Sequence, residues 1–372
     1  MIQDQHQSGP IVWCGIVGVT CVLLYLMQRM LWLSVPFLLA VILYYMLLSP
    51  FTRLLRMGFS RNMSALLVGA GFAVVLLLAV LVAITWIPAP ATGWQDMPSR
   101  YLSAGMRFLR NMMNALEHQF PFIQPAHLSA SVDANLATYT SNFIQRNLTV
   151  VLMAMAAWVP SLLLAPFLAF FFLRDGRRFK RFLARAVPNA FFEKTLFLLH
   201  EVDQTARRYF QGMLKLTVID TVVLALGLWA VGLPSPLLLG FIAAVLAWVP
   251  YVGSIVGCLV VVLVASADAP DNNMVAYSAI GVFIAARLLD DFIFMPMTLG
   301  RSLRIHPLVT VVMIFIGGAL AGVTGLMLVL PLLGIVMVVG ETLGVLITDQ
   351  RLQARHRYAR GLRVKQASLD LK

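Results

Sequence analysis

The sequence predicts an all-α polytopic membrane protein with six full transmembrane spans, two opposed broken-helix hairpins and a small helical extracytoplasmic domain. Three observations support this fold class: the composition, a set of long apolar runs, and two apolar stretches that are interrupted near their middle. Of the 372 residues, 60% are hydrophobic and only 12% are charged. A soluble domain has about 45–50% apolar and about 25% charged residues. The chain therefore needs lipid as the solvent for much of its surface.

Six uninterrupted apolar runs approach or reach the length of about 20 residues that crosses a bilayer as a helix. They are Ile11–Met27, Leu31–Leu48, Ala65–Ile87, Leu148–Leu173, Leu216–Val231 and Val275–Ile293. We expect each run to form one full span. No basic segment precedes the first run, so we expect a retained helix there rather than a signal peptide.

Two further apolar stretches are interrupted by proline and glycine. The stretch Pro236–Ala265 is broken at Pro250–Gly253, and the stretch Leu308–Ile347 is broken at Gly317, Gly318, Gly322 and Gly325. Non-helical backbone does not face lipid, because each unpaired N–H or C=O there costs several kcal/mol. Paired interruptions of this kind indicate a substrate path inside a transporter.

Basic and acidic loops predict the orientation of the spans. The basic segments are Thr52–Arg61, Arg174–Gly212, Met297–Pro307 and the tail after Ile347. The positive-inside rule places these segments and both termini in the cytoplasm. The acidic loop Ser266–Asn273 is then outside, so each interrupted stretch must enter the membrane and return, the two from opposite faces. The alternative, in which both stretches cross completely as helix pairs, stays open.

The non-membrane parts are predicted to be helical. In the extracytoplasmic region, apolar residues recur at helical spacing, namely Leu102, Met106, Leu109, Met113 and Leu116. They predict one amphipathic helix. The segment Phe191–Gln211 has a second apolar stripe and is expected to lie on the membrane surface or against a neighbouring subunit.

The predicted organisation follows from these elements. The first three transmembrane helices occupy 1–88, the extracytoplasmic helical domain 89–147, the fourth transmembrane helix 148–173, a cytoplasmic amphipathic segment 174–212, a transport core with the two hairpins (236–265 and 308–347) 213–347, and a basic cytoplasmic tail 348–372.

The sequence offers no enzyme motif. Walker A, GxSxG and HExxH patterns are absent from it, so we expect neither catalysis nor nucleotide-driven transport, and no cofactor or metal. The formal net charge is +12, but the basic residues lie mostly in short loops beside apolar runs. We therefore expect a lipid bilayer as the partner and no nucleic acid.

Ionisable residues inside apolar segments are costly and indicate function. The candidates are Asp220, Arg287, Asp290, Asp291 and Glu341. Arg287 and Asp291 are four residues apart and are expected to pair on one helix face, with Asp290 on a neighbouring face. This group either orders the helices or contacts a solute or coupling ion. For Asp220 the simpler expectation is that it snorkels towards the membrane surface beside Lys215.

Two further polar candidates adjoin the interruptions. Tyr251 lies in the Pro-Gly break, where its hydroxyl can offer a donor to a polar solute or pack as an ordinary aromatic. His306 precedes Pro307, at the start of the second hairpin, and can titrate near neutrality or simply cap the helix.

Several stretches, in this order, resemble the autoinducer-2 exporter family, also called PerM-like permeases. They are FFLRDGRRF at 171–179, GLP at 232–234, VPYVGSIVG at 249–257, DDFIFMPMTLGRSLRIHPLV at 290–309 and GGALAGVTGLMLVLPLL at 317–333. The resemblance covers essentially the whole chain. The residues at motif positions are Pro250, Tyr251, Gly253, Asp291, Pro296, His306, Pro307, Gly318, Gly325 and Pro331. The family often has asparagine at position 292, where this chain has Phe292.

The resemblance implies a bacterial inner-membrane protein that exports small solutes as a homo-oligomer, with a pentamer as the expected state. We therefore expect a secondary transporter or facilitator that exports a small polar solute, such as an autoinducer-2-like compound. A sodium/proton antiporter, with a proton or sodium as the coupling ion, is the first alternative, because some relatives are linked to that activity. A membrane scaffold without transport is the second.

Overall fold

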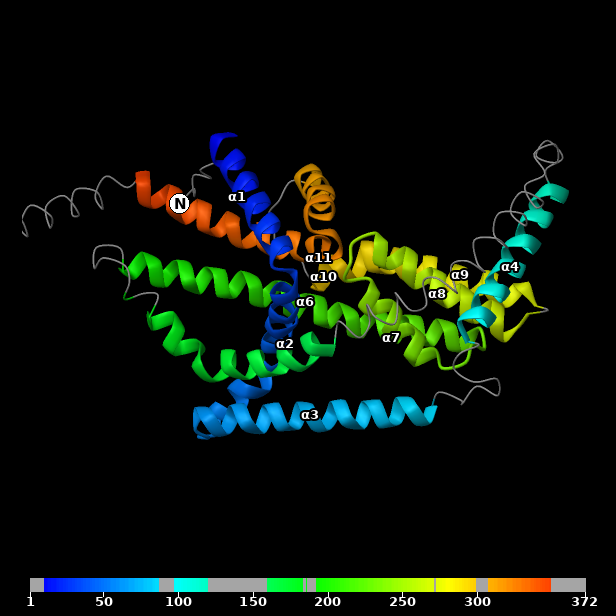
Figure 1. Ribbon diagram of the computed structural model, residues 1–372, viewed down its shortest axis with the longest axis horizontal. Helices are drawn as coiled ribbons and strands as arrows, with labels where there is room; N and C mark the ends of the chain where they lie inside the picture. The colour runs from blue at the N-terminus through cyan, green and yellow to red at the C-terminus, as the bar shows by residue number, and fades with distance from the viewer. Residues whose placement is uncertain are drawn as a thin grey trace, which may run out of the picture. The chain divides into compact units, whose positions relative to one another are not determined.

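The computed structural model describes residues 10–86, 97–119, 159–182, 185, 192–270, 272–298 and 307–348 (Figure 1). These residues form helices and the turns between them, without a strand among them. Five of the helices in the described ranges are long and apolar enough to cross a membrane. The predicted fold class, an all-α polytopic membrane protein, is confirmed.

The helices follow the apolar runs closely. They are α1 (Pro10–Arg29), α2 (Leu31–Arg56), α3 (Arg61–Trp86), α4 (Met97–Gln119), α6 (Phe192–Ala230), α7 (Pro236–Leu246), α8 (Val252–Asp268), α9 (Asn273–Leu289), the π-helical turn η3 (Asp290–Phe294), α10 (Met295–Thr298) and α11 (Pro307–Thr348). A further apolar helix covers Val159–Phe182. The amphipathic segment predicted at Phe191–Gln211 and the span predicted at Leu216–Val231 form one continuous helix, α6, of 39 residues.

The chain divides into two compact units. Unit 1 comprises Met1–Val68, Leu164–Gln211 and Arg301–Lys372, and unit 2 comprises Gly69–Leu163 and Gly212–Gly300. The α7–α8 hairpin belongs to unit 2 and α11 belongs to unit 1.

In unit 1, α11 folds back on itself. Its backbone leaves the helical region at Ala321 and at Gly322, where φ is 56°. A methyl group added at Gly317 would lie 3.0 Å from both the Gly325 carbonyl oxygen and Val329 Cβ. Residues 12 positions apart on an unbroken helix are separated by about 18 Å. The second predicted hairpin therefore exists as two packed arms, and α1 packs on it through Ile16 and Leu24.

Within unit 1, side-chain contacts connect α3 to the helix Val159–Phe182 and α2 to the first half of α6. The Arg61 guanidinium donates to the carbonyl oxygens of Leu173 and Arg174 at 2.8 Å. The Tyr45 ring stacks on Phe210, with the centroids 5.7 Å apart, and the Tyr45 hydroxyl donates to Asp203. The inner part of the predicted amphipathic segment thus packs within its own chain.

In unit 2, α7 and α8 form the first predicted hairpin, and α9 packs beside α8. The helix α4 forms as expected and packs on α8. Its buried side chains are Ala104 and Phe108, while Leu102, Met106 and Met113 of the predicted stripe are half-buried and Leu109 is 41% exposed. The small residue Gly105 lets α4 approach Leu263 closely, and this close approach decides which face is covered.

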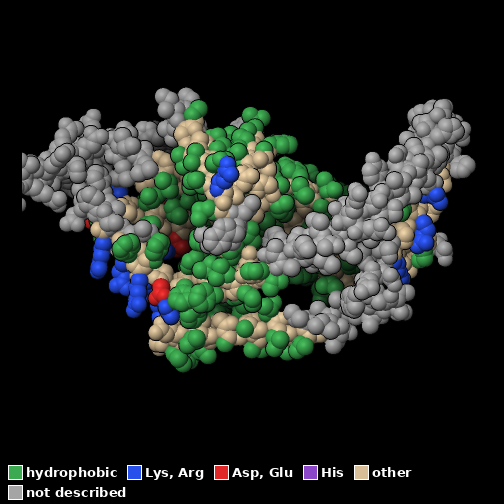
Figure 2. Space-filling model, viewed as in Figure 1, with side chains coloured by type: hydrophobic (Ala, Val, Ile, Leu, Met, Phe, Trp, Pro, Cys, Tyr) green, Lys and Arg blue, Asp and Glu red, His purple; other side chains and the backbone are tan. Residues whose placement is uncertain are grey.

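Large apolar side chains lie on the outside of the helices. Figure 2 shows hydrophobic side chains spread over the visible face of the described residues. On α3, five successive residues are more than half exposed, namely Val74, Val75, Leu76, Leu77 and Leu78. Contiguous exposed apolar surface marks contact with lipid or with another subunit.

Candidate functional site

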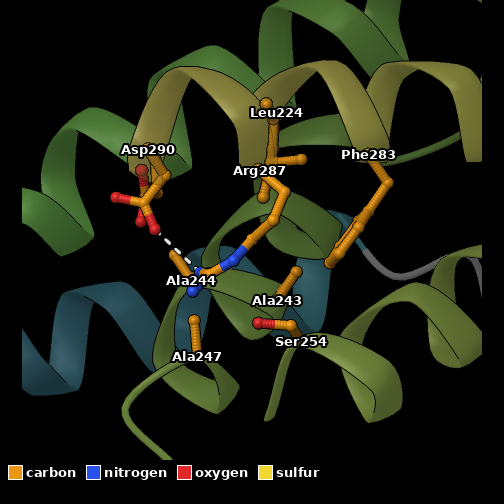
Figure 3. Close-up of a pocket in the computed structure, with 10 residues that line it drawn as sticks. Leu224, Ala243, Ala244, Ala247, Ser254, Phe283, Arg287 and Asp290 are labelled. Atoms are coloured by element: carbon orange, nitrogen blue, oxygen red, sulfur yellow. Dashed lines mark hydrogen bonds and ion pairs between the residues drawn. The ribbon is translucent and has the colours of Figure 1, made fainter. Parts of the chain in front are cut away.

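A small cavity lies inside unit 2, where α6, α7, α8, α9 and η3 converge (Figure 3). Its volume is about 20 Å³, which is enough for one water molecule. The lining residues are Asp220, Leu224, Ala243, Ala244, Ala247, Ser254, Phe283, Ala286, Arg287 and Asp290. The cavity is therefore a mainly apolar chamber with four polar side chains.

Small residues bring these helices together. A methyl group added at Gly240 on α7 would lie 2.8 Å from the Thr221 carbonyl oxygen of α6. A methyl group added at Gly257 on α8 would lie 3.4 Å from both Ala243 on α7 and Phe283 on α9. Small residues allow close helix packing in membranes, where lipid removes much of the hydrophobic drive for association. The alanines that line the cavity follow from this packing.

The turn between α7 and α8 orients the start of α8. Tyr251 has φ of 61° and precedes Val252, the first residue of α8. A methyl group at Gly253 would overlap the Leu246 carbonyl oxygen, so only glycine fits there. The Trp248 indole donates to Thr217 Oγ1 of α6 at 2.6 Å. This turn holds Ser254 at the cavity, where Figure 3 shows its side chain among the lining residues.

Arg287 joins two carboxylates at the end of α9. Its Nη1 lies 2.7 Å from Oδ2 of Asp290 and its Nη2 lies 3.2 Å from Oδ1 of Asp291. The predicted Arg287–Asp291 pair is present, and Asp290, expected on a neighbouring face, also pairs with Arg287. Asp290 is the buried partner, with its side chain 6% exposed, whereas the Asp291 side chain is 49% exposed. The π-helical turn that begins at Asp290 changes the rotation per residue, and such turns are frequent at functional sites.

Two carboxylates are buried at this cavity. Asp290 and Asp220 are 4% and 9% exposed, respectively. Oδ1 of Asp290 has no hydrogen-bond partner within the described residues. The expectation that Asp220 snorkels to the surface was wrong, because α6 presents this residue to the chamber between α7 and α9. In the described part of the chain, no group of three His, Cys, Asp or Glu side chains is arranged to hold a metal ion.

Residues 15–343 of the chain match the family described as AI-2E family transporter. The chain belongs to the AI-2E transporter family. YueF, a candidate transport protein of Bacillus subtilis (strain 168), is 28% identical over 307 residues, which cover 81% of each chain. PerM, a candidate permease of Escherichia coli (strain K12), is 26% identical over 309 residues, 81% of this chain and 84% of PerM.

A second B. subtilis protein, the candidate transport protein YrrI, is 32% identical over 166 residues, 45% of this chain and 46% of its own. The resemblance inferred from the motifs is therefore confirmed. Membership of the AI-2E family, together with the apolar helices, supports a multi-pass membrane transporter.

The AI-2E motif residues fall into three places in the structure. Pro250 and Tyr251 lie in the α7–α8 turn and Gly253 at the start of α8, beside the cavity but not among its lining residues. Pro296 lies in α10, directly after η3. Gly318, Gly325 and Pro331 belong to the two arms of α11, and Pro331 is buried.

The remaining predicted residues are described less fully. Pro307 begins α11 and Glu341 lies inside it, but the structure describes the side chain of neither. His306 lies outside the described residues.

The sequence reasoning missed Ser254 and the small residues around α7 that line the cavity. Ser254 lies within the VPYVGSIVG motif but was not singled out, and Ala243 and Ala244 of α7, with Ala247 directly after it, carry no chemical signal of their own. The signal for Asp220 was present, because a carboxylate within an apolar run is costly. Its partner across the cavity was not readable, because Asp290 lies 70 positions further along the chain.

Proposed function

We propose that this AI-2E family member is a secondary transporter or facilitator of the bacterial inner membrane that exports a small polar solute from the cytoplasm. The observation that carries this proposal is the Asp290 carboxylate, which is 4% exposed and keeps one oxygen without a partner among the described residues. A buried carboxylate is retained at a cost in stability. At a cavity between closely packed helices, such a group supports polar recognition rather than packing.

The two broken hairpins support the same function. In transporters, interrupted helices surround the substrate path because their free backbone groups need polar partners. The α7–α8 turn borders the cavity and contains a residue with positive φ. The break in α11 has the same character at Gly322.

The test compares the culture medium of cells that make equal amounts of the wild-type protein or of Asp290→Asn. Asp268→Asn, a change at an exposed residue of the acidic loop, is the matched control. Mass spectrometry of small polar compounds, with autoinducer-2 as the first compound to quantify, is expected to show at least one compound enriched with wild type and Asp268→Asn only. Identical media for all three strains and for a strain without the protein would contradict export.

Sodium/proton antiport is a second candidate, favoured by the presence of two buried carboxylates at one cavity. Vesicles that contain the protein and a trapped pH-sensitive dye would then change their internal pH when a sodium gradient is imposed. An unchanged internal pH in vesicles that do release a polar solute would favour the exporter. A membrane scaffold would show neither response.

A further inference from the structure

The charges at the cavity do not balance. Arg287 on α9 contributes one positive charge to the cavity lining, while Asp220 on α6 and Asp290 on η3 contribute two negative charges if both are ionised. Asp291, which is 49% exposed and does not line the cavity, adds a third negative charge beside Arg287. The helix α7 has no ionisable residue, and α8 presents only the Ser254 hydroxyl to the cavity. Among the described residues, the cluster therefore carries an excess of negative charge.

Arg287 does not neutralise this excess. Its two terminal nitrogens are already used by Asp290 Oδ2 at 2.7 Å and by Asp291 Oδ1 at 3.2 Å. Oδ1 of Asp290 is left without a partner in the described part of the chain. Asp220 lines the same cavity and is 9% exposed.

A single water molecule does not relieve the repulsion between the two buried carboxylates. The cavity has room for about one, and a water can donate to both carboxylates, but it leaves both charges in place. Two carboxylates that share a site in a medium of low dielectric do not both stay ionised, because the repulsion is removed when one of them takes a proton. The protonated group also becomes a donor, so it can pair with an acceptor that otherwise has none.

We propose that Asp220 and Asp290 share one proton at neutral pH, and, resting on the proposed function, that uptake and release of this proton couple solute export to the proton gradient. The proton comes from water on one side of the membrane and leaves to water on the other. Its binding makes one O–H bond on the carboxylate pair and removes one negative charge. Loss of the proton leaves two ionised carboxylates that compete for Arg287. This competition is transmitted to the π-helical turn between Arg287 and α10.

The test is infrared difference spectroscopy, between ordinary and heavy water, of the full-length protein in lipid vesicles without any solute. At pH 7, wild type is expected to show the C=O stretch of a protonated carboxyl group that shifts in heavy water, since exposed carboxyl groups are ionised at this pH. Asp220→Asn and Asp290→Asn are each expected to lose this band, because the carboxylate that remains at the cavity no longer faces a second one, and the repulsion that favours the protonated form is gone. Asp220→Ser and Asp290→Ser are expected to lose it in the same way.

Asp268→Asn is the control and is expected to keep the band, because Asp268 is exposed and does not line the cavity. The absence of the band from wild type, or its survival after substitution of either Asp220 or Asp290, would overturn the shared proton. The measurement requires no transport, so its failure leaves the proposed export intact. Conversely, a band with the expected behaviour in a protein without flux would refute only the export.

Discussion

Oδ2 of Asp290 lies 2.7 Å from Nη1 of Arg287, three residues earlier, at the point where α9 becomes a π-helical turn. The Asp290 side chain is 6% exposed and the Arg287 side chain is 36% exposed. The carboxylate is therefore enclosed and depends on Arg287, whereas Arg287 remains partly accessible. Loss of Arg287 and loss of Asp290 should consequently have different effects on stability.

Arg287→Leu is expected to destabilise the protein by about 3 kcal/mol, the low end for a broken buried pair, because it leaves the Asp290 charge uncompensated. The double variant Arg287→Leu/Asp290→Leu is expected to recover most of this loss, because both desolvation costs disappear together. The measurement is the apparent melting temperature in detergent. A double variant less stable than Arg287→Leu would mean that Arg287 acts through other contacts.

Asp291→Leu is the matched control for this pair. The Asp291 side chain is 49% exposed, and exposed ion pairs contribute about 0–1 kcal/mol. We expect its melting temperature to stay close to that of wild type. A loss as large as that of Arg287→Leu would show that Asp291, not Asp290, is the principal partner.

The α7–α8 turn gives a second prediction. A methyl group at Gly253 meets the Leu246 carbonyl oxygen and, at 3.0 Å, Ala247 Cα, both of which are backbone atoms that cannot rotate away. Gly253→Ala is expected to destabilise by about 1–3 kcal/mol, as overpacking does, and to reduce export because the turn no longer seats Ser254. Both effects can be measured on one preparation, by melting temperature and by solute release.

Gly281→Ala is its control, because nothing lies within 4 Å of the added methyl group. In the interior of α9, alanine is expected to stabilise by about 0.5–1 kcal/mol relative to glycine. If Gly253→Ala and Gly281→Ala behaved equally, the close approach at Gly253 could not explain the effect of Gly253→Ala.

The fold was largely predictable because the hydrophobic pattern acts locally. Apolar runs gave the positions of most helices, and Pro250, Gly253 and the glycines near 322 marked the two hairpins. The exceptions depend on contacts between distant segments. The buried face of α4 is decided by the approach of Gly105 to Leu263. The helix α6 continues through Gln211, although the change of composition there predicted two separate segments.

The candidate site was predictable in its residue types and in the Arg287–Asp291 pair, but not in the burial of its carboxylates. Arg287 has helical spacing to both Asp290 and Asp291, and the structure has both pairs. Spacing alone does not say which carboxylate is enclosed; here it is Asp290, where the π-helical turn begins. The burial of Asp220 could not be predicted, because it depends on the packing of α6 against α7, with Gly240 at the Thr221 carbonyl. No local sequence pattern contains this contact.

The fold-back of α11 gives a third prediction. A methyl group at Gly325 would collide with the Gly317 carbonyl oxygen, whereas a methyl group at Gly318 meets the flexible end of Leu326 at 3.1 Å. Gly325→Ala is expected to lower the melting temperature clearly more than Gly318→Ala does. The reverse order, measured by thermal unfolding in detergent, would mean that the two arms separate easily at Gly325.

The orientation of the loops gives a fourth prediction. In a variant with Cys14, Cys21 and Cys258 replaced by serine, Asp268→Cys is expected to react with an impermeant thiol reagent added to whole cells. Ser60→Cys should react only after the cells are opened, because its loop is basic and acid-free. Both positions are exposed, whereas Ser266 in the same acidic region is 6% exposed and donates to the Val262 carbonyl. Labelling of Asp268→Cys only in opened cells would reverse the orientation of the α7–α8 hairpin.

The most direct test of the account is solute release from vesicles that contain the purified protein. Vesicles are loaded with a polar metabolite extract, and release is followed by mass spectrometry for wild type, Asp290→Asn, Asp268→Asn and vesicles without protein. We predict that at least one compound leaves the wild-type and Asp268→Asn vesicles faster than the empty ones, and that Asp290→Asn abolishes this difference. Equal release from all four preparations, or full release with Asp290→Asn, would contradict a transport path that depends on the buried carboxylate.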